Sequence, residues 1–367
     1  MSEFCRFIKN GLVYNNNTRQ FTVSPCCYFS KQYSIDPTAN VAGQYARHRQ
    51  SWSQEDFSKT CRICLDAEKT GKHSYRQASF DIVPQAQDGI SMLTVAINKE
   101  CNLACATCGS HSSSRWYNEN KRNGIKEPQE IVDYHVDNHK GLTTDRFLSL
   151  MDNADLHNLD YIKFGGGEPL MTDTHMRVLE RVKDPARVEL QYTSNFSIMP
   201  TPKVADMWSR FKQVKWMASI DGTGDQFDLL RWPHTWDKLV MFVERALRHT
   251  PANVSLGIEH TLNMLNVYYF DRLERWYLKD FCSANTDRRG VLSIHNVEGI
   301  MTLDEVPQRV RDMVNDKLGK DHRVSRTLSQ QGQGRDPAGS VAYLDGLDSQ
   351  RGTDWRRTFP EVEMHYA

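Results

Sequence analysis

The chain has no excess of charge of either sign, no long apolar run and no apolar leader. Its 367 residues include 46 lysines plus arginines and 46 aspartates plus glutamates, so the formal net charge is +0. A strongly basic surface for duplex nucleic acid is therefore not expected. No apolar run approaches the roughly 20 residues that a membrane-spanning helix needs, and residues 1–4 lack the pattern of a secretory signal. These absences predict a cytoplasmic protein without a membrane partner.

The composition predicts an ordered protein with a metal-binding role. With 39% hydrophobic and 25% charged residues, the chain is long enough for one large core and a small satellite domain. The nine cysteines are an odd number. Because no secretory signal accompanies them, they favour an intracellular metalloprotein over a disulfide framework.

Three of the cysteines lie in one short loop after an apolar, strand-like run at residues 93–97. They are Cys101, Cys105 and Cys108. Three thiolates can hold three irons of a cubane [4Fe-4S] cluster, because thiolate is the soft ligand that such clusters take. The fourth iron is then open to the amino and carboxylate groups of a methionine-like ligand, which points to S-adenosylmethionine (SAM). A zinc site is the alternative, although zinc more often takes two cysteine pairs or added histidines.

Further apolar runs follow at intervals and predict parallel strands. Each run ends on small or polar residues, as expected for strands that are buried on both faces and carry functional groups at one end of a barrel. Amphipathic helical patterns lie between the runs, for example at 176–182 and 236–247. The expected strands are 160–164, 187–192, 214–218, 254–263 and 291–296.

A glycine-rich turn follows the second of the predicted strands directly. Gly165, Gly166 and Gly167 precede Glu168 and Pro169. Glycines let a backbone come very close to a ligand. A glycine run alone is an ordinary tight turn, but its place after a buried strand makes this one a candidate ligand-binding loop.

The cysteine spacing and the glycine turn resemble motifs of the radical SAM superfamily. The cysteines match its CxxxCxxC signature, and residues 166–169 match its GGEP element. The resemblance implies an α/β fold with a partial (β/α)6 TIM-like barrel over residues 86–300. It implies reductive cleavage of SAM to a 5′-deoxyadenosyl radical that abstracts hydrogen from a substrate. It also implies a reductant such as flavodoxin or ferredoxin.

The same resemblance assigns SAM contacts to residues at the ends of the barrel strands. Gly166, Gly167 and Glu168 would hold the SAM amino group, Asn195 and Ser219 would line the ribose and carboxylate, and Arg231 would pair with the carboxylate. The alternative for each is a polar strand-end residue that its own loop satisfies, and for Arg231 a surface salt bridge.

A second group of cysteines precedes the barrel and supplies enough thiolates to ligate another cluster completely. Its members are Cys5, the vicinal pair Cys26 and Cys27, Cys61 and Cys64. They resemble the twitch domain, a shortened relative of the SPASM domain that usually follows the barrel and here would occupy residues 1–85. The glycine expected shortly before Pro25 is missing, and motif alignment favours Cys26 over Cys27 as the ligand. The implied cofactor is an auxiliary [4Fe-4S] cluster, and zinc on the same cysteines is the alternative.

Three other features have no role in the resemblance. The polar stretch 110–140 is longer than a strand–helix link requires and is expected to form a substrate lid or a solvated helix pair. The C-terminal extension, 301–367, begins with a helical pattern at 306–318 and keeps aromatic residues to its end. We expect it to pack over the leading domain or close the open side of the barrel. Cys282 is expected to be a small buried apolar residue, with a substrate-facing thiol as the alternative.

These motifs lead to one functional prediction and two alternatives. The prediction is a radical SAM enzyme that oxidatively modifies a peptide or protein, because four thiolates imply a closed auxiliary cluster suited to electron transfer. The first alternative is dehydrogenation or rearrangement of a small molecule such as a sugar, nucleotide or heterocycle. The second is a non-catalytic zinc or iron–sulfur electron-transfer protein. No substrate acid or base is assigned, although Glu259 and His260 near a strand end are candidates.

Overall fold

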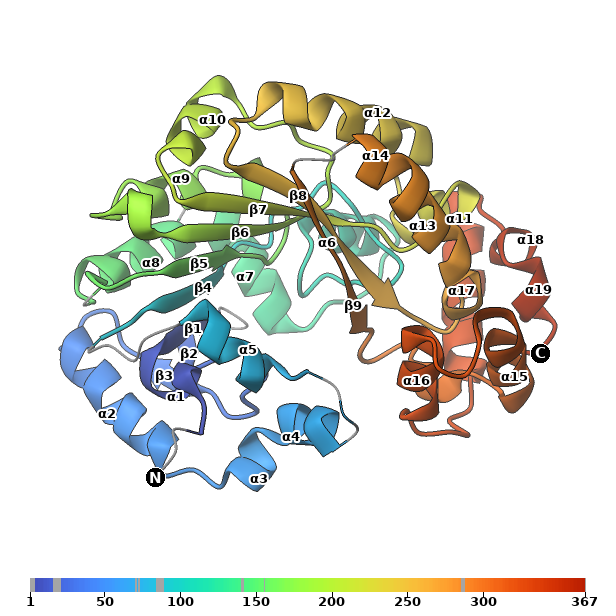
Figure 1. Cartoon of the computed structure of the whole chain (residues 1–367), viewed down its shortest axis with the longest axis horizontal. Coiled ribbons are helices and arrows are strands. Elements are labelled where there is room, and N and C mark those ends of the chain that lie inside the picture. The colour runs from blue at the N-terminus through green and yellow to red at the C-terminus, as the bar shows by residue number, and fades with distance from the viewer. Residues whose placement is uncertain are drawn as a thin grey trace.

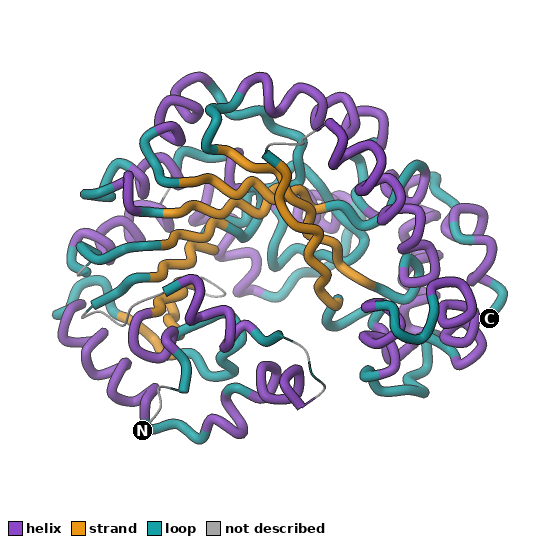
Figure 2. The backbone as a smooth tube through the Cα atoms, viewed as in Figure 1, coloured by secondary structure: helices purple, strands orange, loops and turns teal. Residues whose placement is uncertain are grey.

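The computed structural model shows an α/β fold built on one curved sheet. The structure describes residues 4–15, 21–69, 71, 73–83, 89–139, 142–154, 156–284 and 288–366. Within these ranges, the nine-stranded sheet has the order β3-β2-β1-β4-β5-β6-β7-β8-β9 (Figure 1). Neighbouring strands from β4 to β9 pair in parallel and curve into a partial barrel with helices on the outside (Figure 2). The predicted partial TIM-like barrel is confirmed.

The barrel strands lie close to where the sequence predicted them. They are β4 (Met92–Ala96), β5 (Tyr161–Phe164), β6 (Glu189–Ser194), β7 (Gln213–Ser219), β8 (Val254–Leu262) and β9 (Arg289–Asn296). Apolar side chains of these strands, such as those of Ile162, Leu190 and Leu256, are 0% exposed. The apolar runs identified the strands because helices bury the outer face of a parallel sheet.

Helices between the strands cover the outer face of the barrel. They are α6 (Ser114–Arg122), α7 (Gln129–His139), α8 (Leu142–Asp152), α9 (Thr174–Leu179), α10 (Pro202–Ser209), α11 (Asp225–Leu230), α12 (Trp236–Ala246), α13 (Phe270–Trp276) and α14 (Cys282–Ala284). In α12 the buried residues Leu239, Val243 and Ala246 recur at helical spacing and form the stripe that packs inward. The helices predicted at 176–182 and 236–247 correspond to α9 and α12. None of the described helices is long and apolar enough to span a bilayer.

The leading segment joins the barrel through its first strand. Its elements are α1 (Arg6–Asn10), β1 (Gly11–Asn15), β2 (Phe21–Ser24), β3 (Tyr33–Ile35), α2 (Val41–Ser53), α3 (Phe57–Thr60), α4 (Arg62–Lys69) and α5 (Tyr75–Ile82). Strand β1 pairs in parallel with β4 and antiparallel with β2, and β2 pairs antiparallel with β3. The hairpin therefore continues the barrel sheet, which the sequence did not predict. The predicted boundary between residues 85 and 86 lies outside the described residues, and the division into domains stays a prediction.

The C-terminal extension packs behind the cysteine loop and beside the last strand. Its helices are α15 (Gln308–Leu318), which matches the predicted helix, α16 (Arg323–Ser329), α17 (Ala338–Arg351), α18 (Trp355–Thr358) and α19 (Pro360–Glu363). The aromatic residues Trp355, Phe359 and Tyr366 are at most 4% exposed. Helix α16 borders β9, where Arg323 Nη1 donates to the carbonyl of Leu292 at 3.1 Å. The extension thus lines the open side of the barrel.

Candidate functional site

The cysteine loop lies at the carboxyl end of β4, and its backbone is tied to the loop after α11. The amide of Ala104 donates to the carbonyl of Trp232 at 2.8 Å, and the amide of Ala106 donates to that of Leu230 at 2.9 Å. From the C-terminal extension, the hydroxyl of Tyr343 donates to the carbonyl of Ala106 at 2.8 Å. These three bonds attach the cysteine loop to two other segments and satisfy backbone groups that the surrounding protein removes from water.

Residues at the start of helix α6 hydrogen-bond to the same loop. The hydroxyl of Ser113 donates to the carbonyl of Leu103 at 2.6 Å and also caps the helix by accepting from the amide of Trp116. The indole Nε1 of Trp116 donates to the carbonyl of Cys105 at 2.9 Å. The polar stretch predicted as a lid or a solvated helix pair therefore contributes α6 and α7 as a base for the loop, and its last residue, Lys140, lies outside the described residues.

Two of the three loop sulfurs accept hydrogen bonds. The Sγ of Cys101 accepts from the amide of Leu103 at 3.5 Å and from Nδ2 of Asn195 at 3.7 Å. The Sγ of Cys105 accepts from Nη1 of Arg231 at 3.8 Å. Donors placed on sulfur stabilise thiolate charge and tune a bound metal group. The donor set of this loop therefore fits an iron–sulfur cluster.

Burial makes the free thiols of the loop weak acids. Removal from water, together with a smaller contribution from the neighbouring Cys105, raises the pKa of Cys101 to about 12 and that of Cys108 to about 11. Burial also raises the pKa of Cys105, while Arg231 lowers it in part. Metal binding at these sulfurs is therefore coupled to release of their protons.

Within the described ranges, no three His, Cys, Asp or Glu side chains form a ready-made group for one metal ion, and this holds for the loop cysteines and for those of the leading segment alike.

The glycine turn after β5 packs directly against the segment that precedes the cysteines. The amide of Gly167 donates to the carbonyl of Asn98, and the amide of Glu168 donates to that of Glu100, both at 2.7 Å. A Cβ atom on Gly166, whose φ is +104°, would lie 2.4 Å from the Asn98 oxygen. Only glycine allows this approach. The turn therefore sets the position of the cysteine loop as well as presenting backbone to a ligand.

Glu168 is fully buried and ties the glycine turn to the end of β6. Its Oε2 accepts from the amide of Asn195 at 2.7 Å, and its Oε1 accepts from the hydroxyl of Ser194 at 3.0 Å. Burial raises its pKa to about 7. The sequence assigned this residue to the SAM amino group, and that contact stays a prediction. The structure shows a carboxylate that positions Asn195.

These parts surround one cavity of about 550 Å³ at the carboxyl ends of the barrel strands. Most of the barrel residues predicted to bind cofactor line it: Cys101, Cys105, Cys108, Gly166, Gly167, Asn195, Ser219 and Arg231. Glu168 lies behind this wall. The carboxyl end is where barrel enzymes collect their functional groups.

Arg231 is held at this cavity by a buried carboxylate that the sequence analysis missed. Its Nη2 lies 2.7 Å from Oδ2 of Asp221, and the two side chains are 12% and 0% exposed. Although burial opposes the charge, Asp221 raises the pKa of the guanidinium. Asp221 also accepts from the amide of Thr261 at 2.8 Å. The alternative of a surface salt bridge is wrong because the pair is buried. The predicted contact of Arg231 with the SAM carboxylate stays a prediction.

A second group of polar side chains lies on the same cavity wall. The Oε1 of Glu259 accepts from Nε2 of Gln191 at 2.9 Å and lies 3.7 Å from Nζ of Lys163. Lys163 and Glu259 line the cavity, and so does His295 on β9. The other candidate, His260, is 1% exposed and bonds through Nδ1 to the carbonyl of Ile220 at 2.8 Å, which gives it a structural role. The sequence analysis did not single out Lys163. It could have done so, because Lys163 is a charged residue within a strand that was predicted to be buried.

Four thiols gather in the leading segment. Cys5, Cys26, Cys61 and Cys64 are 7%, 7%, 8% and 6% exposed. Burial raises the pKa of Cys26, and Cys27, Cys5 and Cys64 raise it further. Burial raises that of Cys61 to about 11, with added contributions from Cys5 and Cys64. Electrostatic coupling thus links Cys26 and Cys61 each to Cys5 and Cys64, and all four thiols belong to the same part of the leading segment.

Cys27 differs from its neighbour Cys26 in exposure. Cys27 is exposed, whereas Cys26 is buried. The surrounding protein still desolvates the Cys27 thiol and raises its pKa, while Lys163 of the barrel lowers it. Cys27 is also coupled to Cys26 and Cys64, whose pKa values it raises.

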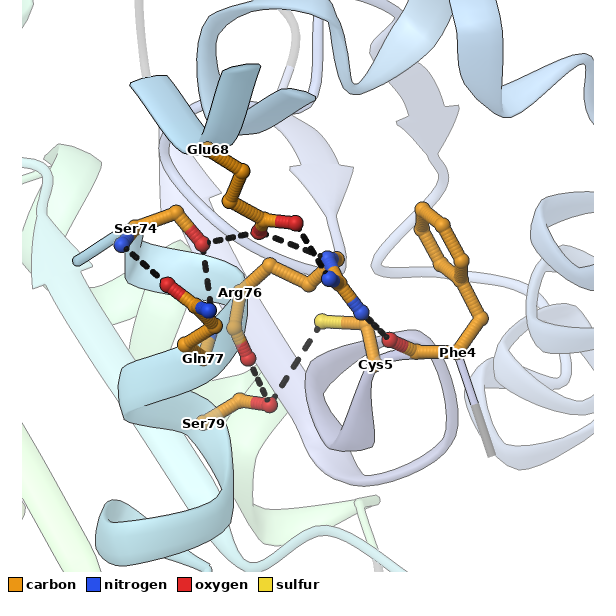
Figure 3. A network of polar contacts seen from close by, with 7 residues as sticks. All are labelled: Phe4, Cys5, Glu68, Ser74, Arg76, Gln77 and Ser79. Atoms are coloured by element: carbon orange, nitrogen blue, oxygen red, sulfur yellow. Dashed lines mark hydrogen bonds and ion pairs between the residues drawn. The ribbon is translucent and has the colours of Figure 1, made fainter. Parts of the chain in front are cut away.

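A polar network beside Cys5 connects residues of α4 and α5 to Phe4 and Cys5 (Figure 3). Arg76 Nη1 donates to the carbonyl of Phe4 at 2.7 Å, and its Nε donates to Oε1 of Glu68 at 2.9 Å. The thiol of Cys5 lies 3.7 Å from the hydroxyl of Ser79. Burial raises the pKa of Cys5, and Ser79 and Arg76 oppose this shift. A cation beside a cysteine favours the thiolate that binds metal.

Comparisons with known proteins give distant matches. No protein-family model and no curated protein matches the chain. Native anSMEcpe with bound AdoMet is similar at a TM-score of 0.39 and 16% identity, over 66% of this chain and 63% of that one. SuiB of Streptococcus suis matches with a TM-score of 0.37 and 12% identity, over 84% of this chain and 68% of that one. SuiB bound to the precursor peptide SuiA matches with a TM-score of 0.35 and 11% identity, over 96% of this chain and 74% of that one. The matched part of anSMEcpe is thus less than two thirds of its length.

Proposed function

We propose that this protein is a radical SAM enzyme that carries out a net oxidative modification of a peptide or protein. One observation carries the proposal. The three loop cysteines, the glycine turn and the polar strand ends all line a single cavity at the carboxyl end of the barrel. A structural metal site would have no need of a cavity, because closed coordination is what stabilises a fold.

The residues of this cavity suit a [4Fe-4S] cluster on Cys101, Cys105 and Cys108 with SAM beside it. Together these cofactors supply reductive cleavage of SAM and a radical that takes hydrogen from the substrate. The chain itself would bind and orient these cofactors and shield them from water. Asn195 and Arg231 donate to the cluster-side sulfurs. The buried position of these donors keeps water away from the sulfurs and strengthens the interaction.

The leading cysteines suit a closed auxiliary cluster, which we propose is held by Cys5, Cys26, Cys61 and Cys64. A larger cavity of about 780 Å³ reaches Cys64 and shares Tyr28, His295 and Asn296 with the barrel cavity. A substrate in the barrel is therefore near a second metal group that can accept an electron from it. That electron flow makes the overall reaction an oxidation, and the cycle needs an external reductant such as flavodoxin or ferredoxin.

The test is anaerobic reconstitution with iron and sulfide, followed by reaction with SAM and dithionite. We expect about eight irons per chain and formation of 5′-deoxyadenosine. A Cys282→Ala variant is the matched control, because its thiol belongs to neither cysteine set and is 7% exposed. Stoichiometric zinc in place of iron, or iron without any 5′-deoxyadenosine, contradicts the proposal and favours a non-catalytic metalloprotein.

A further inference from the structure

A groove runs along the free edge of β9. The 780 Å³ cavity has residues 292–296 as one wall, and residues of α4 and α5 with the turn between them as the other. Helix α16 borders it with Arg323 and Arg326. Figure 1 shows α16 beside the end of β9 and α4 across from it. Five consecutive strand residues span about 16 Å, so the groove is long and narrow.

The backbone of β9 presents hydrogen-bonding groups to this groove. Strand β9 is the last strand of the sheet among the described residues. The amide of Val297 donates to the carbonyl of Leu262 of β8, so odd-numbered residues face β8. The carbonyl of Leu292 accepts from Arg323 on the opposite side. By alternation, Ile294 and Asn296 turn their amides and carbonyls into the groove.

The charged side chains that line the groove are cationic. They are the two arginines, Arg323 and Arg326, and none of the described residues that line the groove is an aspartate or glutamate. Burial lowers the pKa of His295, so this histidine adds no positive charge at neutral pH. Arg323 is partly balanced by Glu274 at 3.2 Å. The exposed Arg326 donates through Nε to the carbonyl of Asp321 at 2.8 Å, which leaves its charge on the groove. An occupant with carboxylates complements this surface.

The groove leads into the barrel. Tyr28, His295 and Asn296 line both cavities, and Asn296 is the last residue of β9. A chain that follows the edge of β9 past Asn296 therefore enters the cavity that holds the loop cysteines. The groove is also adjacent to Cys64, one of the leading thiols.

We propose that this groove binds an acidic segment of a peptide substrate as an added strand on β9 and passes the adjoining residues into the barrel cavity. This inference rests on the proposed function and deepens it by naming the way in which the substrate is recognised. Main-chain bonds to Ile294 and Asn296 supply affinity, because strand addition needs no particular side chain at those positions. Arg326 and Arg323 select carboxylate side chains.

The experiment offers a display library of random nonapeptides to the full-length, anaerobically reconstituted protein. We expect the selected pool to gain Asp and Glu and to lose Pro, because proline cannot supply a strand's amide. Arg326→Glu should reverse the charge preference of the pool. Arg309→Glu is the matched control, since Arg309 is an exposed arginine of neighbouring α15 that does not line the groove. A pool without acidic enrichment, or one that Arg326→Glu leaves unchanged, overturns the inference.

A second measurement tests the backbone pairing without relying on a protein variant. A selected peptide is synthesised with N-methyl groups on alternate amides, in the two possible registers. In one register the methyl groups face β9 and should weaken binding by at least about tenfold, and in the other the loss should be much smaller. Ile294→Pro should weaken the unmodified peptide in the same way, with its fold checked by circular dichroism. Equal binding of both methylated forms contradicts strand addition.

The outcomes separate this inference from the proposed function. The same preparation is assayed for 5′-deoxyadenosine in the absence of peptide. Formation of 5′-deoxyadenosine without peptide selectivity contradicts peptide binding in the groove and leaves the radical SAM proposal standing. Peptide selectivity without formation of 5′-deoxyadenosine contradicts the radical SAM proposal and supports peptide binding in the groove.

Discussion

The two cysteine sets of this molecule differ in how far their thiols are exposed to a cavity. In the barrel, three thiols line a cavity of about 550 Å³, and Cys101 and Cys108 are only partly buried. In the leading segment, four thiols are each at most 8% exposed, and of these four Cys64 alone lines the 780 Å³ groove. Metal centres that bind a substrate keep an open position, and centres that only hold a fold or pass electrons are closed by protein ligands. In the proposed function, the same residue type would therefore serve two different tasks.

The sets also differ in how they are anchored. The barrel loop is held by backbone bonds to the loop after α11, by α6 and by Tyr343 of the C-terminal extension. The leading thiols come from separate short elements, and Arg76 stabilises the segment around Cys5. A rigid support suits a centre that must orient a cofactor to a fraction of an ångström. Four predictions test this contrast.

The largest effect is expected from removing one ligand of each set in turn. Cys105→Ala should lose about four irons and all formation of 5′-deoxyadenosine, because we propose that the open cluster is the one that binds SAM. Cys64→Ala should also lose about four irons but keep 5′-deoxyadenosine within about twofold of wild type, while substrate turnover stops. Iron analysis and chromatography of the products measure both. If the two variants behave alike, the open and closed assignments fail.

The vicinal pair in the leading segment offers the next test. Cys26 is buried, as Cys5, Cys61 and Cys64 are, whereas Cys27 is exposed. Cys26→Ala should therefore lose the auxiliary cluster, about four irons per chain, and Cys27→Ala should keep it. Iron counting and visible absorbance of the two variants decide the matter. Loss of iron in Cys27→Ala alone would reverse the ligand assignment.

The buried ion pair behind the barrel cysteines should affect stability more than an exposed pair does. Arg231→Met leaves Asp221 charged and unpaired at 0% exposure and should lower the free energy of unfolding by about 3–5 kcal/mol. The exposed pair of Arg210 and Asp206, 2.6 Å apart at the C-terminal end of α10, is the control, and Arg210→Met should cost less than about 1 kcal/mol. Urea unfolding measures both. Equal costs would show that Asp221 is not desolvated.

The smallest effect concerns the pH dependence set by Glu168. Burial raises its pKa from 4.5 to about 7. Between these values the folded chain binds a proton that the unfolded chain has lost, so stability should fall as the pH rises through this window. The effect is at most about 3 kcal/mol. Urea unfolding of the iron-free, reduced protein at pH 5 and pH 8 should show this fall, and Glu168→Gln should lack it. An equal pH dependence in both proteins would contradict the assignment.

Local patterns in the sequence predicted the barrel and the cysteine loop, because their signals lie within a few residues. The apolar runs of β4 to β9 and the spacing of Cys101, Cys105 and Cys108 need no knowledge of distant residues. The pairing of β1 with β4 was missed because residues 11–15 and 92–96 are far apart in the chain. A short hairpin gives no sign of the strand beside which it will lie.

The inward-facing charges were missed for a related reason. Asp221 follows β7 as an ordinary strand-end residue, and only the fold brings it to Arg231. Lys163 meets Glu259 across the barrel from a different strand. Glu168 was recognised by its motif, but its hydrogen bonds to residues 194 and 195 depend on the neighbouring strand. Side chains whose partners lie on other strands need the tertiary structure.

The most direct test of the account is electron paramagnetic resonance of reduced Cys64→Ala, in which we expect the barrel cluster alone. Adding SAM should shift the signal of the reduced cluster, because we propose that SAM binds the iron that lacks a protein ligand. A Cys64→Ala protein that retains about four irons and whose signal does not change with SAM would contradict an open iron at Cys101, Cys105 and Cys108.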